Sequence, residues 1–334
     1  MTSKFADLAE PSVDDFREGS VAWLIERYIK ESLLPGMRPL GASHVYSLRG
    51  LQRLPIGSKR AGTLRKQDII AHCQERRAKV VAATVNHDVT ALRGVLKYAG
   101  AAWDDCEDVS DAPIAAAGAV LTQHGLVGKS TPRTRIPTDA EVTALLNYFR
   151  DPKRASRMEI RMPDLIAAAL ESSRRVSELC RWQHGDIDWT RTDAAGNPTP
   201  MYMIRDLKHP TKKLGNHKWF PLTPNLAEIV RMQPRRSPDN PTERVFPFNS
   251  KSASAAYTIA KKALGIQGLR FHDNRRAAIT KWLALLKSPH KVKLISGHET
   301  TQILERVYDA TQPDVIHAEL AAISRSNEWQ ASTK

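Results

Sequence analysis

The chain has 334 residues, more than the ~100–200 residues of one ordinary domain, so we expect two domains. Hydrophobic residues make up 41% and charged residues 26%, a globular composition that excludes disordered, collagen-like and disulfide-scaffold proteins. Fifty Lys and Arg against 36 Asp and Glu leave a net charge of +14. This surplus indicates an anionic partner, with nucleic acid as the leading candidate and a basic surface kept for solubility as the alternative.

The cysteines indicate a reducing compartment. Cys73, Cys106 and Cys180 form no C-x-x-C pair, so the sequence predicts neither a disulfide framework nor a thiolate zinc site. The N-terminus lacks the apolar core of a signal peptide, and the most apolar stretch, 112–121, is shorter than the ~20 residues of a membrane-spanning helix. We therefore expect a cytoplasmic protein without membrane contact.

The first part of the chain predicts a bundle of helices. Apolar residues recur at helical spacing in 20–34 and 83–100, and further helices are expected from Ser43, over 66–80 and within 108–125. The apolar stripe of the 83–100 helix consists of Val85, Val89, Leu92, Leu96 and Ala99. Its opposite face carries polar and cationic side chains that can reach phosphates and base edges, or can form an ordinary solvated face. These side chains are Asn86, Thr90, Arg93 and Lys97.

A linker separates the two predicted domains. Residues 127–137 combine Gly, Ser, two prolines and three cations, and Thr138 with Glu141 then has the spacing of a capping box at a new helix. The predicted organisation is an N-terminal tail (1–16), a helical domain (17–125), a linker (126–137) and a second domain (138–334).

The second domain predicts helices around a small sheet. One helix is expected over 165–182, and helices dominate again from Ser252. Between them, 201–207 and 217–222 read as two short strands joined by a turn rich in Lys, Gly and Asn. The predicted fold class is mainly α with a small antiparallel sheet.

Five groups of polar residues in the second domain make chemical sense together. Each has a simple structural explanation alone, such as an i,i+3 ion pair between Arg175 and Glu178, a solvated lysine turn, or a tyrosine in the core. On a helix, Glu178 could equally orient the Arg175 guanidinium. In chain order the groups are Arg175 with Glu178 and Leu179, the hairpin lysines, His272 with Arg275, Gly297 with His298, and Tyr308.

In this order the residues resemble the motifs of the tyrosine recombinase (phage integrase) family. Those motifs are an Arg followed by x-x-Glu-Leu, a hairpin lysine, His-x-x-Arg, Gly-His, and a tyrosine nine or ten residues later. The resemblance extends to the helical first domain and so covers nearly the whole chain. It implies a two-domain, C-shaped DNA clamp, in which a helical core-binding domain is joined to a catalytic domain.

The resemblance also implies a role for each residue. Tyr308, the only tyrosine after Tyr257, would attack the DNA phosphate, and His272 would accept its proton. Arg175, Arg275 and His298 would bind the phosphoryl oxygens. The product is a 3′-phosphotyrosyl link, formed without metal, ATP or other cofactor.

Two lysines are candidates for the general acid that protonates the leaving 5′-oxygen. The spacing back from Pro221 in a short hairpin points to Lys213, whereas a longer hairpin would place Lys208 at the end of the first strand. Lys208 is preferred, because it directly follows the predicted strand and Pro210 then breaks the ladder.

The chain departs from the common family pattern at three positions without losing a catalytic group. Ser173 stands where Gly is common, Asn274 where an aliphatic residue is common, and Arg276 where His is frequent. Outside the catalytic set, the residues expected to contact DNA are Thr90, Arg93, Lys97, Arg133 and Arg135.

The resemblance implies double-stranded DNA with specific sites as the partner, and a homotetramer in the synapse built from protomers that are monomers in solution. The gene would belong to a bacterium, phage or plasmid. The C-terminal run 313–326 could dock on a neighbouring protomer or pack on its own domain. A type IB topoisomerase and a catalytically silent DNA-binding accessory protein are the alternative functions.

Overall fold

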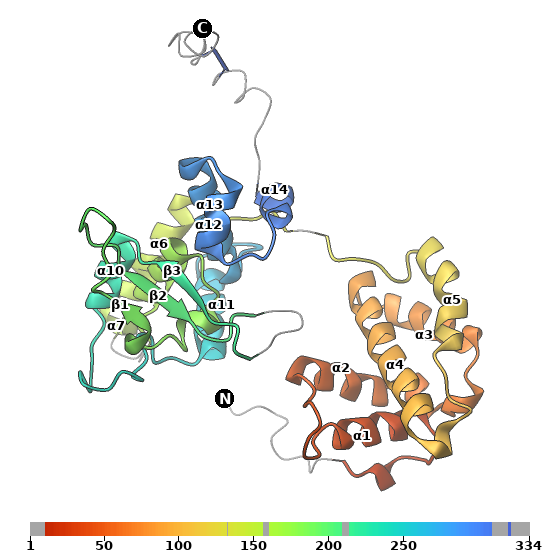
Figure 1. The fold of residues 1–334 in the computed structure, drawn as a ribbon. Coiled ribbons are helices and arrows are strands. Elements are labelled where there is room, and N and C mark those ends of the chain that lie inside the picture. Colours follow the sequence, from red (N-terminus) through yellow and green to blue (C-terminus); the bar gives the residue numbers. More distant parts are fainter. Residues whose placement is uncertain (1–10, 132, 156–159, 209–213, 309–319, 322–334) are drawn as a thin grey trace, which may run out of the picture. The chain divides into compact units, whose positions relative to one another are not determined.

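The chain divides into two compact units, Met1–Thr131 and Pro132–Lys334 (Figure 1). The division lies within the segment 126–137 that the sequence marks as a linker. The computed structural model describes residues 11–131, 133–155, 160–208, 214–308 and 320–321, with the backbone alone at 155 and 306–308.

The first unit consists of helices around one core. Its helix α1 starts where the Ser20 hydroxyl accepts the Trp23 backbone N–H at 3.2 Å, which satisfies one of the free donors of the first turn. Short 3-10 turns, η1 (Val13–Asp15), η2 (Pro55–Ser58), η3 (Ala61–Thr63) and η4 (Asp104–Cys106), connect the helices. The α-helices are α1 (Val21–Glu31), α2 (Ala42–Gln52), α3 (Lys66–Arg77), α4 (Ala82–Ala102) and α5 (Ala112–Gln123).

Helix α4 crosses the core of the first unit and confirms the predicted stripe. All five residues of that stripe are buried, and the four residues of the opposite face are exposed. Asp88 is also buried on α4, and Arg76 of α3 compensates its charge through an ion pair of 2.8 Å.

The second unit packs helices against a three-stranded antiparallel sheet of order β1-β2-β3. Tyr202 pairs with Phe220 across β2 and β3, and both side chains are buried in the core. Pro221 is tolerated because β3 is an edge strand and a proline there costs no ladder hydrogen bond. The elements are α6 (Asp139–Arg150), α7 (Pro152–Ala155), α8 (Met162–Ser172), α9 (Val176–Leu179), η5 (His184–Asp186), β1 (Ile187–Asp188), β2 (Met201–Ile204), β3 (Lys218–Pro221), α10 (Pro224–Arg231), α11 (Ser250–Ala263), α12 (His272–Leu286), α13 (Pro289–Ser296) and α14 (Gln302–Tyr308).

The prediction of one continuous helix over 165–182 is wrong. Helix α8 ends at Ser172, because Ser173 adopts the left-handed conformation with φ 54° and ψ 24°, and the short helix α9 begins three residues beyond it, at Val176. For a residue other than glycine this conformation costs roughly 1–2 kcal/mol. The break turns the chain so that Arg175 caps α9 instead of lying within a helix.

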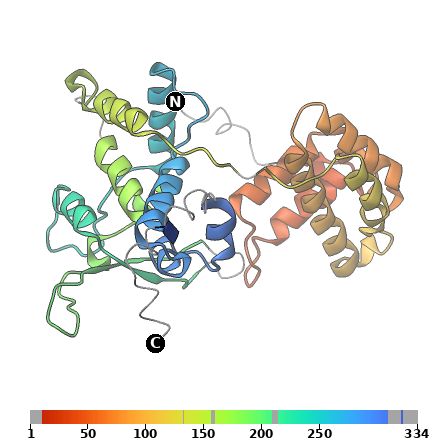
Figure 2. The same ribbon diagram turned by 90° about the horizontal axis from the view of Figure 1, so that it is seen from above.

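Helices α12, α13 and α14 pack together at the end of the second unit (Figures 1 and 2). Ile279, Val292 and Leu304 are fully buried between them, and Trp282 packs against this small core. This packing fixes the ends of α12 and α13, which carry the predicted site residues. None of the helices in the described part of the chain is long and apolar enough to cross a bilayer.

Candidate active site

Arg175 is the N-cap residue of α9, and its side chain pairs with the carboxylate of Glu178. Glu178 accepts a hydrogen bond from Arg175 Nη1 at 2.6 Å and another from the Arg175 backbone N–H at 3.1 Å. The Glu178 side chain is 1% exposed and that of Arg175 is 30% exposed. The predicted ion pair is therefore present, and it leaves one side of the guanidinium facing solvent.

Glu178 is charged despite its burial. Burial raises the pKa of the Glu178 carboxyl, but the charges of Arg174, Arg175 and Arg275 outweigh this effect, so that its pKa lies below its ordinary value. The ionised carboxylate of Glu178 therefore keeps its ion pair with Arg175.

Arg275 lies on the first turn of α12 and is 3% exposed. Its Nη1 donates to the carbonyl oxygen of Ser173, and its Nη2 donates to that of Ser296 at 3.1 Å. The same Nη2 lies 3.3 Å from Nε2 of His298. Arg275 therefore joins the end of α8 to the end of α13 and contacts a second predicted site residue.

His298 is placed by a sharp turn after α13. Gly297 caps that helix with φ 73°, a conformation that favours glycine, and the Ser296 hydroxyl lies 2.7 Å from Nδ1 of His298. A guanidinium can only donate, so Nε2 accepts from Arg275 and the ring proton sits on Nδ1, directed at Ser296. A serine hydroxyl can also donate, so Ser296 can support the other tautomer when Nε2 has to donate.

His298 is a neutral imidazole at physiological pH. Desolvation lowers the pKa of His298 to about 3, and the charges of Arg275, Arg175 and Arg174 act in the same direction.

His272 is the first residue of α12 and is exposed at the surface. Partial desolvation of its imidazole, followed by the charges of Arg275 and Arg175, lowers the pKa of His272 to about 4. A neutral imidazole can accept a proton, which is what the base of the predicted reaction requires.

The structure describes one of the two candidate lysines. Lys208 is exposed, and the strand before it ends at Ile204 instead of extending to residue 207, so Lys208 does not directly follow the strand as expected. Lys213 and Pro210 lie outside the described residues. The next hairpin cation, Lys218, forms an ion pair with Glu299, the residue after His298.

Tyr308 is the last residue of α14, the helix that follows the His298 turn. Its side chain lies outside the described atoms, so the position of the hydroxyl stays a prediction. The C-terminal run 313–326 likewise lies outside the described residues, apart from 320–321.

Sequence reasoning missed Arg174. Its guanidinium is 1% exposed, donates to the carbonyl of Ile295 next to the His298 turn, and stacks 3.9 Å from the ring centroid of Phe220. In the sequence, Arg174 is marked only by its position beside Arg175. Two adjacent arginines also occur on exposed surfaces, so this position does not indicate burial.

The predicted DNA-contacting residues of the first unit share one surface. Thr90, Arg93 and Lys97 are exposed on α4 and line an open hollow of about 420 Å³ together with Tyr28 and Tyr98. Exposed cations beside aromatic rings are suited to a phosphate backbone. Whether they bind DNA stays a prediction.

The two linker arginines already have partners within the second unit. Arg133 forms an ion pair of 2.9 Å with the buried Asp273, and Arg135 forms one with Glu141. These pairs anchor the chain after the division between the units.

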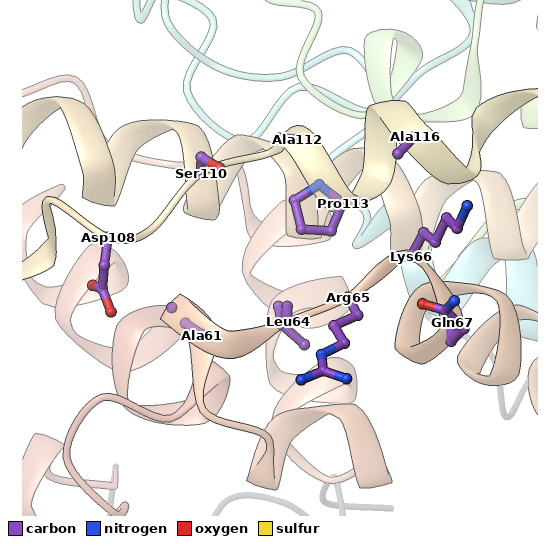
Figure 3. A pocket seen from close by; sticks show the side chains of 11 residues that line it. Ala61, Leu64, Arg65, Lys66, Gln67, Asp108, Ser110, Ala112, Pro113 and Ala116 are labelled. Atoms are coloured by element: carbon purple, nitrogen blue, oxygen red, sulfur yellow. The ribbon is translucent and has the colours of Figure 1, made fainter.

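Another hollow of the first unit, of about 390 Å³, lies between the start of α3 and the start of α5. Figure 3 shows Asp108 at one end, near Ala61, and Lys66 with Gln67 at the other. None of the predicted site residues whose side chains the structure describes lines it. Among the residues that the structure describes, no group of three or more His, Cys, Asp or Glu side chains could hold a metal ion.

Sequence comparison finds recombinases. No family model matches the chain. A putative integrase/recombinase of Haemophilus influenzae is 25% identical over 301 residues, which are 90% of this chain and 88% of the relative. A shufflon-specific DNA recombinase of Escherichia coli is 24% identical over 275 residues, 78% of this chain and 62% of the relative.

Structure comparison agrees. The Tn1549 transposon integrase, solved in complex with transposon right end DNA, has a TM-score of 0.62 at 14% identity and covers 91% of this chain and 99% of its own. A lambda integrase tetramer bound to a Holliday junction has a TM-score of 0.63 at 14% identity, with 88% of this chain and 79% of its own covered. The chain is similar in sequence and in fold to the tyrosine recombinases. The mainly helical fold with a small antiparallel sheet is thereby confirmed, and so is the resemblance to this family.

Proposed function

We propose that the protein is a site-specific DNA recombinase that cuts and rejoins DNA through a 3′-phosphotyrosyl intermediate. One observation carries this proposal: Arg175, Arg275 and His298 come from three separate segments and converge, with Arg275 in contact with His298 at 3.3 Å. The charges of both arginines also reach His272 and lower its pKa. The similarity to an integrase/recombinase and a shufflon recombinase supports this function over the topoisomerase and accessory-protein alternatives.

The first chemical step breaks one phosphodiester bond and forms another. The phenolic oxygen of Tyr308 attacks the phosphorus, the bond from phosphorus to the 5′-oxygen breaks, and the phenolic proton passes to the neutral imidazole of His272. The leaving 5′-oxygen takes a proton from Lys208 or Lys213. The ester bond is conserved, so that a 5′-hydroxyl of another strand can reverse the step without an external energy source.

The basic groups stabilise the phosphoryl oxygens during this transfer. Arg175 offers paired N–H donors with a permanent charge and is oriented by Glu178, and Arg275 adds a second permanent charge beside His298. His298 donates from Nε2 after its proton moves from Nδ1, with Ser296 supplying the hydrogen bond to Nδ1. Removal of one such donor typically costs ~3–4 kcal/mol of transition-state stabilisation.

The remaining assignments extend this function to the whole chain. The first unit is the core-binding domain and uses Thr90, Arg93 and Lys97 on DNA, while the second unit is the catalytic domain. Arg133 and Arg135 contact DNA after exchanging their carboxylate partners for phosphates. The active assembly is a homotetramer on two duplexes, the single protomer is a monomer in solution, and the protein works in the cytoplasm of a bacterial host.

A covalent trapping experiment tests the proposal. The protein is expressed in bacteria, and DNA that stays attached to it in SDS is sequenced to find the recognised site. A duplex carrying that site, nicked so that the cut fragment diffuses away, is then incubated with the protein in EDTA. We expect an SDS-resistant adduct with the wild type and none with Tyr308→Phe, which differs by one hydroxyl. Absence of an adduct with the wild type, or an equal adduct with Tyr308→Phe, would falsify the proposed chemistry.

A further inference from the structure

Two guanidiniums join the C-terminal ends of α8 and α13. Arg174 donates from Nε to the carbonyl of Ser172 at 3.1 Å and from Nη2 to the carbonyl of Ile295. Arg275 makes the equivalent pair of bonds one residue further along each helix. We call these four bonds the double clasp.

The double clasp suits the chemistry of helix ends. The last carbonyls of a helix have no partner within the helix, and the helix dipole leaves partial negative charge there. A guanidinium satisfies both needs, since it is a cation with several donors in one plane. Each arginine thus binds two helix ends that would otherwise repel each other.

We propose that Arg174 is a positioning residue for strand cleavage, which fixes the distance between Arg175 and His298 through the double clasp. This inference rests on the proposed function. Arg175 directly follows Arg174 in the chain. His298 lies three residues after Ile295, just beyond the turn at Gly297. The two residues that bind the phosphate therefore extend from the two helix ends that the clasp joins.

The contacts of Arg174 support a positioning role. The residue is 1% exposed, and its guanidinium stacks on Phe220 of β3, so that it also ties the sheet to the clasp. Its Nη1 is buried and has no hydrogen-bond partner among the described residues. A buried donor without a partner is unfavourable, so an apolar side chain would fill this space better if packing alone mattered.

The test compares three variants of the full-length protein. Arg174→Met removes the charge and the donors at similar length, and Arg174→Lys keeps the charge but cannot span both carbonyls as a planar fork. Arg161→Met is the matched control, because Arg161 lies just before the other end of α8 and also donates to a backbone carbonyl, that of Met232, at 3.2 Å.

At saturating nicked DNA we expect Arg174→Met to form the adduct at least about tenfold more slowly than the wild type, because displacement of catalytic groups by about 1 Å costs up to ~100-fold. Its Kd for uncut site DNA should stay within about twofold of the wild-type value, since the residue does not touch DNA. Arg174→Lys should recover part of the rate, and Arg161→Met should behave as the wild type. A lower rate at an unchanged Kd, recovered in part by the conservative Arg174→Lys, is the pattern that a purely structural role would not predict.

A wild-type rate in folded Arg174→Met overturns the inference while leaving the proposed function intact. Failure of the wild type to form any adduct overturns the proposed function itself. If Arg174→Met does not fold, Arg174→Lys decides: a wild-type rate in that variant shows that the planar fork is not needed and overturns the positioning role.

Discussion

His272 and His298 are neutral in the folded protein over most of the pH range in which histidine ordinarily titrates. Desolvation lowers their pKa values to about 4 and about 3, from the ordinary value of 6.5 for histidine, and the neighbouring arginines add to the effect. The unfolded chain therefore binds more protons than the folded chain between pH 6.5 and the folded-state values. Their contribution to stability is complete above that window and is lost as the pH falls through it.

We predict that the free energy of unfolding decreases from neutral pH to about pH 5, by at most about 1.4 kcal/mol per pH unit for His298 and by less for the exposed His272, whose charge the solvent screens. Urea denaturation at a series of pH values measures this slope. His298→Gln removes one of the two titrations and should give a shallower slope above about pH 5, where most carboxylates stay charged. An unchanged slope in this variant would contradict the low pKa of His298.

At the scale of single elements, the turn at the end of α13 is the most constrained part of the site. A β-carbon at Gly297 would lie 3.0 Å from the ring of Phe220 and 3.2 Å from Nη1 of Arg174, and the residue has φ +73°. Both the backbone conformation and the space therefore require glycine.

Gly297→Ala should lower the free energy of unfolding by roughly 1–2 kcal/mol through its backbone and by about 1–3 kcal/mol more through overpacking. It should also abolish adduct formation, because the displaced turn carries His298. Gly265→Ala is the matched control, with φ +69° and no atom within 4 Å of a new β-carbon, so only the backbone cost applies. Equal losses of stability in the two variants, measured by denaturant unfolding, would show that the close approach to Phe220 has no cost.

The comparison of elements also shows what the sequence could predict. The stripe on α4 and the capping box of Thr138 and Glu141 depend on spacings of three or four residues, and the structure has both. The break at Ser173 escaped prediction because helix-forming residues continue on both sides of it. The bond from Arg174 to Ile295 joins residues 121 positions apart, and no local pattern records such a contact.

The site itself was predictable only as an ordered set of motifs. Spacing placed His272 and Arg275 on one turn of α12, as the structure has them. The partners of Arg133 and Arg135 could not be foreseen, because a cation in a linker looks the same whether it meets water, a phosphate or a buried carboxylate.

At the scale of the whole molecule, each unit has its own hydrophobic core, and a net charge of +14 is distributed over the chain. Binding to DNA releases counterions from the phosphates that the cations neutralise, so affinity should fall steeply with salt.

We predict that a plot of log Kd against log salt concentration for uncut site DNA has a slope of several units, and that Lys97→Gln reduces it by about one. Fluorescence anisotropy titrations at several salt concentrations measure it. Lys79→Gln is the control, because Lys79 precedes α4, is not among the residues expected to contact DNA, and is paired with Glu75 at 3.2 Å. A flat salt dependence would contradict electrostatic binding, and equal slopes for wild type and Lys97→Gln would remove the α4 face from the interface.

The double clasp has a consequence for how this protein can change over evolutionary time. All four of its acceptors are main-chain oxygens, which every amino acid possesses. Substitutions at positions 172, 173, 295 and 296 therefore leave the acceptors in place as long as the backbone keeps its path. While the backbone keeps that path, divergence breaks the joint only at its two donors, so Arg174 and Arg275 are the positions where homologous sequences should show whether the joint is inherited.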